Sequence, residues 1–313
     1  MNYATLLILY SPYSKAATFI VEGIHLPNVE ILPLAHRKNK LSILFFHLCR
    51  ILRMNKMAAY FGYEKECYNK LLYNTYKNIL CLDCCKLNEY KVIRSLVNTP
   101  KELDIFFWNP LSLWEKEENK LKKKIMHLKK IGYKLSTFDF QDATKYKLEL
   151  RKNINRRIDL GIDYSTDYDF YFVGTPKGRK NILQQLSNFL SQKGFKIKFI
   201  IVESPKDYIT QIDNIRYSSK TKCIVDITAS NQTGLTLRPF DALFLKKKLL
   251  TNNVNIINTD FYEENNIYIF NENNMNGILE FMTKPYKEIP DKIVNQYEIN
   301  QWLIDNFIHS DKN

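Results

Sequence analysis

Apolar, strand-like runs alternate with helix-like runs along this chain, and this alternation constrains the fold more than any other feature. In the first half, five apolar runs indicate strands, and helix candidates between them begin near Leu41, Glu89 and Leu113. The five runs are residues 4–10, 29–34, 78–84, 103–108 and 133–140. Apolar strands separated by helices predict parallel sheets that are covered on both faces.

The third helix candidate carries signals at both ends. Ser112 and Glu115 have the spacing of a capping box, in which each side chain bonds a backbone N–H group near the helix start. Gly132 stands where a helix is expected to stop. We therefore expect one helix that begins near Leu113 and ends before Gly132.

The alternation stops and then restarts. Residues 145–169 are charged, turn-prone and weakly periodic, which predicts a connection between domains. Strand and helix patterns then resume at 170–174, 179–192, 195–202 and 222–227, with a helical stretch introduced by Ser204 and Pro205. Two successive strand–helix–strand sets predict two Rossmann-like domains facing a cleft, an α/β fold with boundaries at 1–152 and 153–292. Residues 298–308 indicate a final amphipathic helix.

Composition limits the class of protein and its partners. Hydrophobic residues make up 45% of the 313 residues and charged residues 25%, as in globular proteins. A net charge of +13 favours polyanionic partners, namely nucleic acid, an anionic membrane surface or phosphorylated substrates. We expect a cytoplasmic protein, because the sequence has neither a convincing secretory signal nor an apolar run of ~20 residues.

The loop expected after residue 174 has the features of an anion site. Gly174 and Gly178 allow a ligand close to the backbone, and Thr175, Arg179 and Lys180 surround a helix start, together with Lys177. Basic side chains oppose the dipole at a helix start, so an anion is a better explanation for them than local stability. The spacing is not that of a Walker A loop. Phosphate binding and a plain strand–helix turn remain the alternatives.

A second polar loop follows Asp226, which ends a predicted strand. Pro239 suits the first position of the next helix and Asp241 its first turn. Two interpretations of Asp241 are open: a carboxylate that stabilises the helix start, or one that accepts hydrogen bonds from the ribose of a nucleotide. Besides Asp226, the polar or glycine positions of this loop include Thr228, Ser230, Asn231, Gln232, Thr233, Gly234 and Thr236.

Three stretches together resemble a known family. They read YDFYFVGTPKGRKNIL, CIVDITASNQTGLTLRPFDALFLKKKLLTNN and STFDFQDATKYKLE, at residues 168–183, 223–253 and 136–149. They are similar to bacterial glycosyltransferases of the lipopolysaccharide-core and surface-polysaccharide type, which belong to the GT-B class. The resemblance extends over most of the chain from about Phe106 onward.

The resemblance implies a fold, an activity and a set of site residues. It implies that the C-terminal domain binds a nucleotide-sugar donor, that the N-terminal domain binds the acceptor, and that no catalytic metal or cofactor takes part. A final segment, 293–313, is implied to cross back onto the N-terminal domain. Asp241 takes the ribose position, where Glu is usual, and Arg179, Arg238 and Lys180 are candidates to stabilise the diphosphate. Gly174, Thr175, Gln232, Gly234 and Thr236 are implied to line the phosphates and the donor sugar.

The sequence does not identify a catalytic base. An inverting transfer needs an Asp, Glu or His near the acceptor hydroxyl. Asp139 and His25 are the candidates, and His36 is a further one. Each has a structural role as its alternative.

A metal site at Asp167 and Asp169 is not expected, because this pair precedes a strand where a metal-binding Asp-x-Asp should follow one. The CLDCC run at 81–85 lacks a second ligand pair, so buried thiols are favoured over zinc.

The N-terminal half offers one sign of a membrane partner. Residues 41–57 are apolar on one side, with Arg50, Arg53 and Lys56 on the other. The alternatives are a helix buried against the sheet and an interfacial helix on an anionic inner membrane.

Taken together, the motifs and the resemblance lead us to expect a metal-independent glycosyltransferase acting on a lipopolysaccharide or lipid-linked glycan. The alternative is a non-catalytic nucleotide- or nucleic-acid-binding protein, although no nucleic-acid partner is expected.

Overall fold

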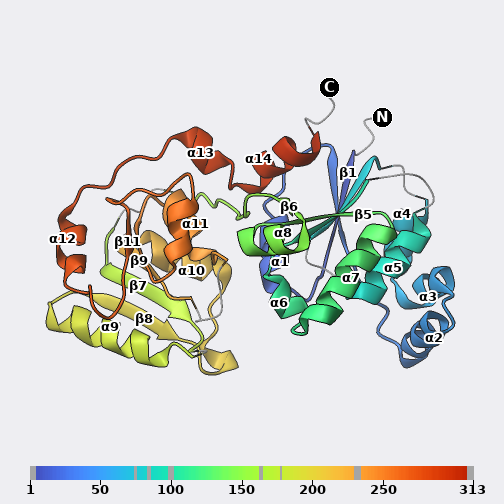
Figure 1. Ribbon diagram of the computed structural model, residues 1–313, viewed down its shortest axis with the longest axis horizontal. Coiled ribbons are helices and arrows are strands. Elements are labelled where there is room, and N and C mark those ends of the chain that lie inside the picture. Colours follow the sequence, from blue (N-terminus) through green and yellow to red (C-terminus); the bar gives the residue numbers. More distant parts are fainter. Residues whose placement is uncertain are drawn as a thin grey trace. The chain divides into compact units, whose positions relative to one another are not determined.

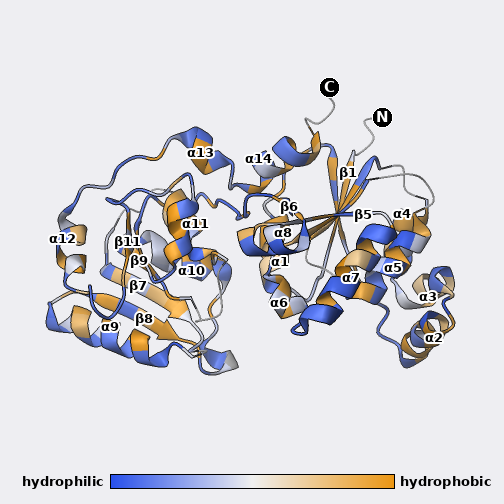
Figure 2. Cartoon of the chain, in the orientation of Figure 1, coloured by the Kyte–Doolittle hydropathy of each residue, from blue (hydrophilic) through white to orange (hydrophobic). Residues whose placement is uncertain are grey.

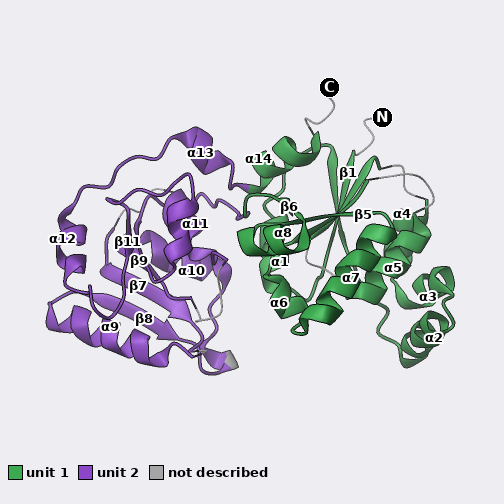
Figure 3. Cartoon of the chain, viewed as in Figure 1, with its two compact units in different colours: residues 1–153, 299–313 green, residues 154–298 purple. Residues whose placement is uncertain are grey.

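A computed structural model describes residues 5–73, 76–82, 86–97, 102–161, 165–176, 178–228 and 234–308. The chain divides into two compact units, coloured separately in Figure 3. Unit 1 comprises residues 1–153 and 299–313, and unit 2 comprises residues 154–298. The predicted boundary after residue 152 therefore lies one residue from the observed division. The C-terminal segment returns to unit 1 at residue 299, six residues later than predicted, because residues 293–298 belong to unit 2.

Unit 1 is built on a sheet of six parallel strands in the order β2-β1-β3-β4-β5-β6 (Figure 1). The strands are β1 (Leu6–Tyr10), β2 (Val29–Pro33), β3 (Asn78–Leu82), β4 (Glu102–Phe107), β5 (Tyr133–Thr137) and β6 (Glu149–Leu150). All five predicted runs form strands, and only the short β6 was not predicted. Neighbouring residues such as Leu6 and Leu7 are both fully buried, so both faces of the sheet are covered.

The helices of unit 1 are more divided than the sequence pattern predicts. They are α1 (Lys15–Val21), α2 (Lys40–Ile51), α3 (Asn55–Gly62), α4 (Lys65–Leu72), α5 (Leu87–Leu96), α6 (Leu111–Trp114), α7 (Glu118–Lys130), α8 (Phe140–Tyr146) and α14 (Ile299–Leu303), which continues as a π-helical turn at Ile304–Ile308. The return of α14 to unit 1 is held by Trp302. Its ring lies 4.9 Å from that of Phe106, and its Nε1–H donates to the Lys152 carbonyl at 3.0 Å.

The predicted capping box at Ser112 and Glu115 is wrong. The Leu111 N–H donates to the Asp142 carboxylate at 2.8 Å and starts α6 early, and the backbone turns extended at Glu115. Glu115 then pairs with Lys124 at 2.7 Å, and a separate helix, α7, starts at Glu118. The predicted stop at Gly132 is confirmed: it follows the C-cap of α7 with a φ of +92°, a conformation that favours glycine.

Unit 2 contains a sheet of five parallel strands in the order β11-β10-β9-β7-β8. Its strands are β7 (Tyr168–Gly174), β8 (Ile197–Ile201), β9 (Thr221–Asp226), β10 (Lys248–Thr251) and β11 (Ile267–Ile269). Its helices are α9 (Lys180–Gln192), α10 (Gln211–Ser219), α11 (Arg238–Phe244), α12 (Gly277–Thr283) and α13 (Asp291–Asn295), with 3₁₀ turns at Pro205–Asp207 and Val254–Asn258. Both units are therefore parallel α/β sheets of the Rossmann-like kind.

Among the described residues, none of the helices combines the length and hydrophobicity needed to cross a bilayer.

Candidate functional site

Two loops lie side by side at the carboxyl edge of the sheet in unit 2. The first follows β7 and leads into α9, and the second follows β9 and leads into α11. Because β7 and β9 are neighbouring parallel strands, their carboxyl ends meet at one edge of the sheet (Figure 1). This is the edge at which open α/β sheets bind ligands.

Arg238, the first residue of α11, connects the two loops. One of its terminal nitrogens, Nη1, donates to Asp226 Oδ1 at 3.1 Å, and the other, Nη2, donates to the Val173 carbonyl at 2.5 Å. The Arg238 Nε atom is buried and has no hydrogen-bond partner among the described residues. The guanidinium is therefore fixed in place and still has donor capacity for a further acceptor.

Asp226, the last residue of β9, fixes the Arg238 guanidinium by accepting its hydrogen bond. Its carboxylate is completely buried and accepts hydrogen bonds from Thr236 Oγ1 at 2.8 Å, from Thr251 Oγ1 at 3.1 Å and from Arg238. Asp226 was expected to end a strand but not to belong to the site. The available signal was a carboxylate at the carboxyl end of an otherwise apolar strand.

Arg179 approaches the same point from the first loop. Its Nε donates to the Thr175 carbonyl at 3.0 Å, and its Nη1 donates to the carbonyl of Ile227, in the second loop. Burial, together with the neighbouring Arg238 guanidinium, lowers the pKa of Arg179 below its usual value. Both guanidinium groups lie near the Phe172 ring, at 5.7 Å for Arg179 and 5.1 Å for Arg238.

Gly174 provides the space in which these two arginines converge. A Cβ atom at this position would lie 2.8 Å from Arg238 Nη2 and 3.2 Å from Arg179 Nη2. Two cationic groups therefore lie where a side chain at residue 174 would begin, and Asp226 is the one carboxylate among the described residues that forms an ion pair with either of them. This excess positive charge, held by main-chain carbonyls at the edge of a sheet, is suited to binding a phosphate or diphosphate.

Lys180 differs from the two arginines. Its side chain is 74% exposed and pairs with Glu203 at 3.4 Å. It begins α9 as predicted, and no side chain caps that helix start. Lys180 therefore contributes to the potential around the loop without being fixed by it.

Asp241 lies inside unit 2. It is 7% exposed, and its Oδ1 accepts a hydrogen bond from Asn155 Nδ2 at 2.8 Å. Burial raises the pKa of Asp241 to about 7, even though Asn155, Arg238 and Asn214 act in the opposite direction. Leu237 is the N-cap of α11 and no side chain caps this helix, so the structure shows no capping bond from Asp241. Ribose binding stays a prediction, and would require this carboxylate to release or share its bond with Asn155.

The two described ends of the second loop, Thr228 and Gly234, are bonded to residues that follow β10. The side-chain oxygen of Asn252, just after β10, accepts hydrogen bonds from the Thr228 N–H at 2.8 Å and from the Thr228 hydroxyl at 3.1 Å. The Gly234 carbonyl accepts from Asn253 Nδ2 at 3.4 Å. Asn252 and Asn253 were not among the predicted site residues. Lys177 and residues 229–233, including Gln232, lie outside the described residues.

The two candidates for a catalytic base lie in unit 1. Asp139 is 4% exposed and caps α8, because its carboxylate accepts from the N–H groups of Gln141 and Asp142 at 2.9 and 3.0 Å. His25 has an exposed side chain, and its backbone N–H donates to Asn300. His36 lies 3.5 Å from Glu89 and packs on Phe46. The catalytic assignment of Asp139 and His25 stays a prediction.

Metal ligands are not gathered in the part of the chain that the structure describes. No group of three His, Cys, Asp or Glu residues there is arranged to hold a metal ion. Asp169 lies at the amino end of β7, where it accepts from the Lys196 N–H at 2.8 Å and pairs with Lys222 at 2.8 Å. Cys81 is buried in β3, and Cys84 and Cys85 lie outside the described residues.

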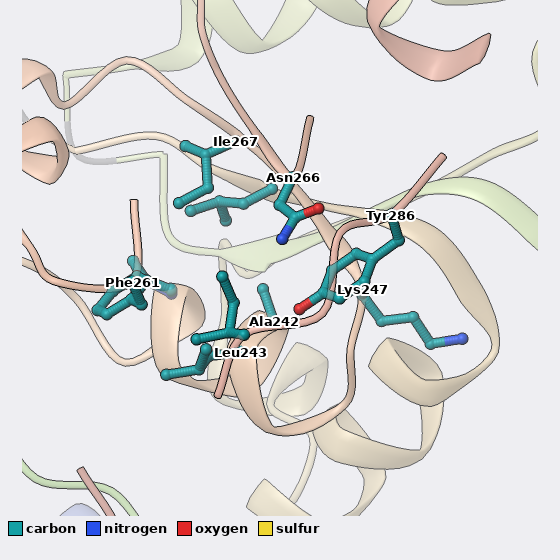
Figure 4. A pocket seen from close by; sticks show the side chains of 10 residues that line it. Ala242, Leu243, Lys247, Phe261, Asn266, Ile267 and Tyr286 are labelled. Carbon is teal, nitrogen blue, oxygen red and sulfur yellow. The ribbon is translucent and has the colours of Figure 1, made fainter. Parts of the chain in front are cut away.

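A small cavity behind α11 is not a nucleotide site. Figure 4 shows its lining, which includes Leu243, Phe261 and Tyr286. Its volume of about 10 Å³ is no more than a single water molecule needs. The convergence of Arg179 and Arg238 at Gly174 therefore remains the best-formed candidate site of unit 2.

Similarity to known proteins is found in three-dimensional structure. The sequence matches no protein-family model and no curated protein. Among solved structures, Anabaena HepE in complex with UDP and glucose aligns over 96% of this chain and 98% of its own, with 10% identity and a TM-score of 0.54. A DNA-modifying β-glucosyltransferase aligns over 95% and 92% of the two chains, with 13% identity and a TM-score of 0.48.

TarM aligns over 74% of this chain, with 12% identity and a TM-score of 0.46, and this chain spans about half of TarM, 52% of its length. We base the comparison of folds on HepE, whose TM-score exceeds 0.5. The α/β fold with two Rossmann-like domains, expected from the sequence and from its resemblance to the GT-B class, is confirmed.

Proposed function

We propose that the protein is a glycosyltransferase that uses a nucleotide-sugar donor and no metal ion. The observation that carries the proposal is the convergence of Arg179 and Arg238 at Gly174, with Asp226 as the one carboxylate among the described residues that forms an ion pair with either of them. Departure of a nucleoside diphosphate builds negative charge in the transition state. Fixed guanidinium groups stabilise that charge without the reorganisation that water would need.

The fold supports this proposal. HepE, which shares the two-domain architecture over nearly its whole length, was solved with UDP and with UDP-glucose. A uridine diphosphate sugar is therefore the first donor to test. In this proposal unit 2 binds the donor, and Asp241 is the candidate for the ribose. The non-catalytic alternative has no comparable observation in its favour.

The acceptor is the finer part of the proposal. We propose a lipopolysaccharide-core or related lipid-linked glycan, bound by unit 1. Support comes from the resemblance of residues 136–149, 168–183 and 223–253 to transferases of that kind, and from the net charge of +13. Such acceptors are carried by membranes, so the proposal includes peripheral contact with the cytoplasmic face of an inner membrane.

A thermal-shift screen against UDP-, GDP-, ADP-, CMP- and dTDP-sugars in the presence of a chelator tests donor binding. A ligand that binds only the native state raises the melting temperature by mass action. We expect UDP-sugars to raise it, and Arg179→Gln to weaken binding roughly 10- to 100-fold, the usual cost of losing a charge-assisted hydrogen bond. Lys193→Gln is the matched control, because it removes one charge at the far end of α9.

Gly174→Ala gives an independent arm of the same screen. It keeps both arginines, but its new methyl group would lie within 2.8 Å of Arg238 and would displace that guanidinium. We expect weaker nucleotide binding in this variant as well. The proposal fails if none of the nucleotide-sugars shifts the wild-type melting temperature. It also fails if Arg179→Gln and Gly174→Ala both bind as tightly as wild type.

A further inference from the structure

Helix α2 of unit 1 is apolar on two sides, and only one side is covered. Phe46 and Cys49 face the core of the unit and are about 5% exposed. The opposite stripe has the helical spacing i, i+3, i+7, i+10 and continues onto α3. Its members, which we call the hairpin face, are Leu41, Leu44, Leu48, Ile51, Met57 and Tyr60.

The hairpin face is strongly exposed for such large side chains. Leu41, Leu44 and Ile51 are 68%, 60% and 77% exposed. Figure 2 shows hydrophobic residues, in orange, along both α2 and α3. The interpretation of α2 as a helix buried against the sheet therefore accounts for one side of it only. A contiguous apolar surface of this kind marks an interaction site.

The charged residues of the segment that carries this surface all have one sign. Between Glu30 and Glu64 the sequence contains no acidic residue. The same segment contains six basic ones, Arg37, Lys38, Lys40, Arg50, Arg53 and Lys56. Apolar side chains flanked by Lys and Arg are the composition of helices that lie in the interface of an anionic bilayer.

A basic hollow of about 790 Å³ adjoins the turn between α2 and α3. Its charged lining consists of Arg50 from the last turn of α2, Arg53 from the turn after it, Lys91 and Arg94 from α5, and His127 from α7, without a carboxylate. Arg94 is fixed by the carbonyls of Ile131 and Val97 at 2.9 and 3.0 Å. Among the described residues, no carboxylate pairs with Arg50, Arg53 or Lys91.

His127 reflects the positive potential of the hollow. Burial lowers the pKa of its imidazole, and Lys91 and Lys130 lower it further. No acidic neighbour contributes to this shift. An anion that entered the hollow would therefore meet Arg50 and Arg53 at the end of α2 and Lys91 and Arg94 on α5, with no carboxylate in the lining to repel it.

We propose that the hairpin face docks on an anionic phospholipid bilayer, with the basic hollow receiving the phosphate of a lipid headgroup. Charge complementarity favours this occupant over a second copy of the chain, because two copies would bring six basic residues against six. The apolar side chains would enter the boundary between headgroups and acyl chains, and the basic stems would extend along it to the phosphates.

This inference deepens the proposed function, because a lipid-linked acceptor is presented at such a surface. It rests on the proposed function only for the identity of the acceptor. Its own observations all lie in unit 1, whereas the donor site lies in unit 2. Vesicle binding is measured without nucleotide, so a failure of one proposal is distinguishable from a failure of the other.

Co-sedimentation of the full chain with vesicles of phosphatidylcholine, with or without phosphatidylglycerol, tests the proposal. We expect binding to the vesicles that contain phosphatidylglycerol, at least tenfold stronger than to neutral vesicles and weaker at high salt. Leu44→Glu with Leu48→Glu should reduce the partition coefficient at least tenfold, because both side chains are exposed and the fold does not need them. Val254→Glu with Ile257→Glu is the matched control on unit 2, where these side chains are 62% and 53% exposed.

A second pair of variants tests the hollow. Arg53→Gln with Lys91→Gln should remove most of the preference for phosphatidylglycerol, whereas Lys193→Gln with Lys292→Gln, which removes the same charge from unit 2, should keep it. Equal losses in both pairs would overturn the headgroup assignment. The docking surface would be overturned if the wild-type protein did not bind the vesicles. It would also be overturned if analytical ultracentrifugation showed a lipid-free dimer that the variant Leu44→Glu with Leu48→Glu dissociates.

Discussion

At the scale of single residues, the candidate site is defined by what surrounds each charge. Arg179 was expected from the sequence, because basic residues at a helix start lack a local reason to be there, and Arg238 was expected from the resemblance to GT-B glycosyltransferases. Asp226 was not, because its role depends on Thr236, Thr251 and Arg238, which meet only in the folded sheet. The need for glycine at 174 was attributed to a ligand, whereas the structure shows that the arginine side chains themselves occupy the space.

Asp241 makes the stability of the protein depend on pH. Its ordinary pKa is 3.8 and its native pKa about 7. Between these values the native protein keeps a proton that the unfolded chain has released, so the free energy of unfolding falls as the pH rises and levels off above about pH 7. At ~1.4 kcal/mol per pKa unit, the cost of ionising the buried carboxyl approaches ~4 kcal/mol.

Asp241→Asn removes this ionisation and keeps an oxygen to accept from Asn155. We expect the variant to gain stability relative to wild type by ~2–4 kcal/mol between pH 4 and pH 7, and no more above pH 7. Urea denaturation followed by far-UV circular dichroism at intervals from pH 4 to pH 8 measures the difference. A difference that stays constant over this range would show that the carboxyl does not titrate there.

At the scale of helices and strands, the sequence predicted strands better than helices. Strands β1, β3, β4 and β5 are largely buried on both faces, so each appears in the sequence as a continuous apolar run, and the edge strand β2 is partly buried. The two-residue strand β6 has exposed residues and no such signal. Helix limits near Leu113 were misjudged because a tertiary bond from Leu111 to Asp142 decided where α6 begins. Residues 41–57 were predicted to be apolar on one side, whereas α2 has apolar residues on both its buried and its exposed side.

At the scale of the whole molecule, the chain passes from unit 1 to unit 2 and returns. The two passages come together where the Asn155 N–H donates to the Tyr297 carbonyl at 2.9 Å. Five residues apart, Tyr297 and Trp302 belong to different cores. Tyr297 packs on Phe240 and Phe261 in unit 2, and Trp302 packs on Phe106 in unit 1. The boundary was predicted from composition, but the point of return depends on these ring contacts and was placed six residues too early.

This division predicts that neighbouring substitutions act on different units. Trp302→Ala should destabilise unit 1 by ~3–5 kcal/mol, the usual cost of truncating a buried aromatic side chain. Tyr297→Ala should destabilise unit 2 instead. All three tryptophans, Trp108, Trp114 and Trp302, lie in unit 1, so tryptophan fluorescence follows unit 1 while circular dichroism follows both units.

In urea, we expect Trp302→Ala to lower the midpoint of the fluorescence transition, read from the two remaining tryptophans. Tyr297→Ala should leave that midpoint within error and shift only the transition seen by circular dichroism. If both variants shift the fluorescence midpoint equally, the two units unfold as one, and the division of the C-terminal segment between them has no energetic meaning.

The release of nucleoside diphosphate in excess chelator measures whether the protein breaks down a nucleotide-sugar without a metal ion. With the sugar donor found by the screen, we predict that wild-type protein releases diphosphate at the same rate with or without chelator. Arg179→Gln should slow the release at least tenfold at saturating donor, because it removes a charge that stabilises the leaving group. If chelator abolishes the release, the reaction needs a metal ion. If Arg179→Gln leaves the release unchanged, Arg179 does not stabilise the leaving group.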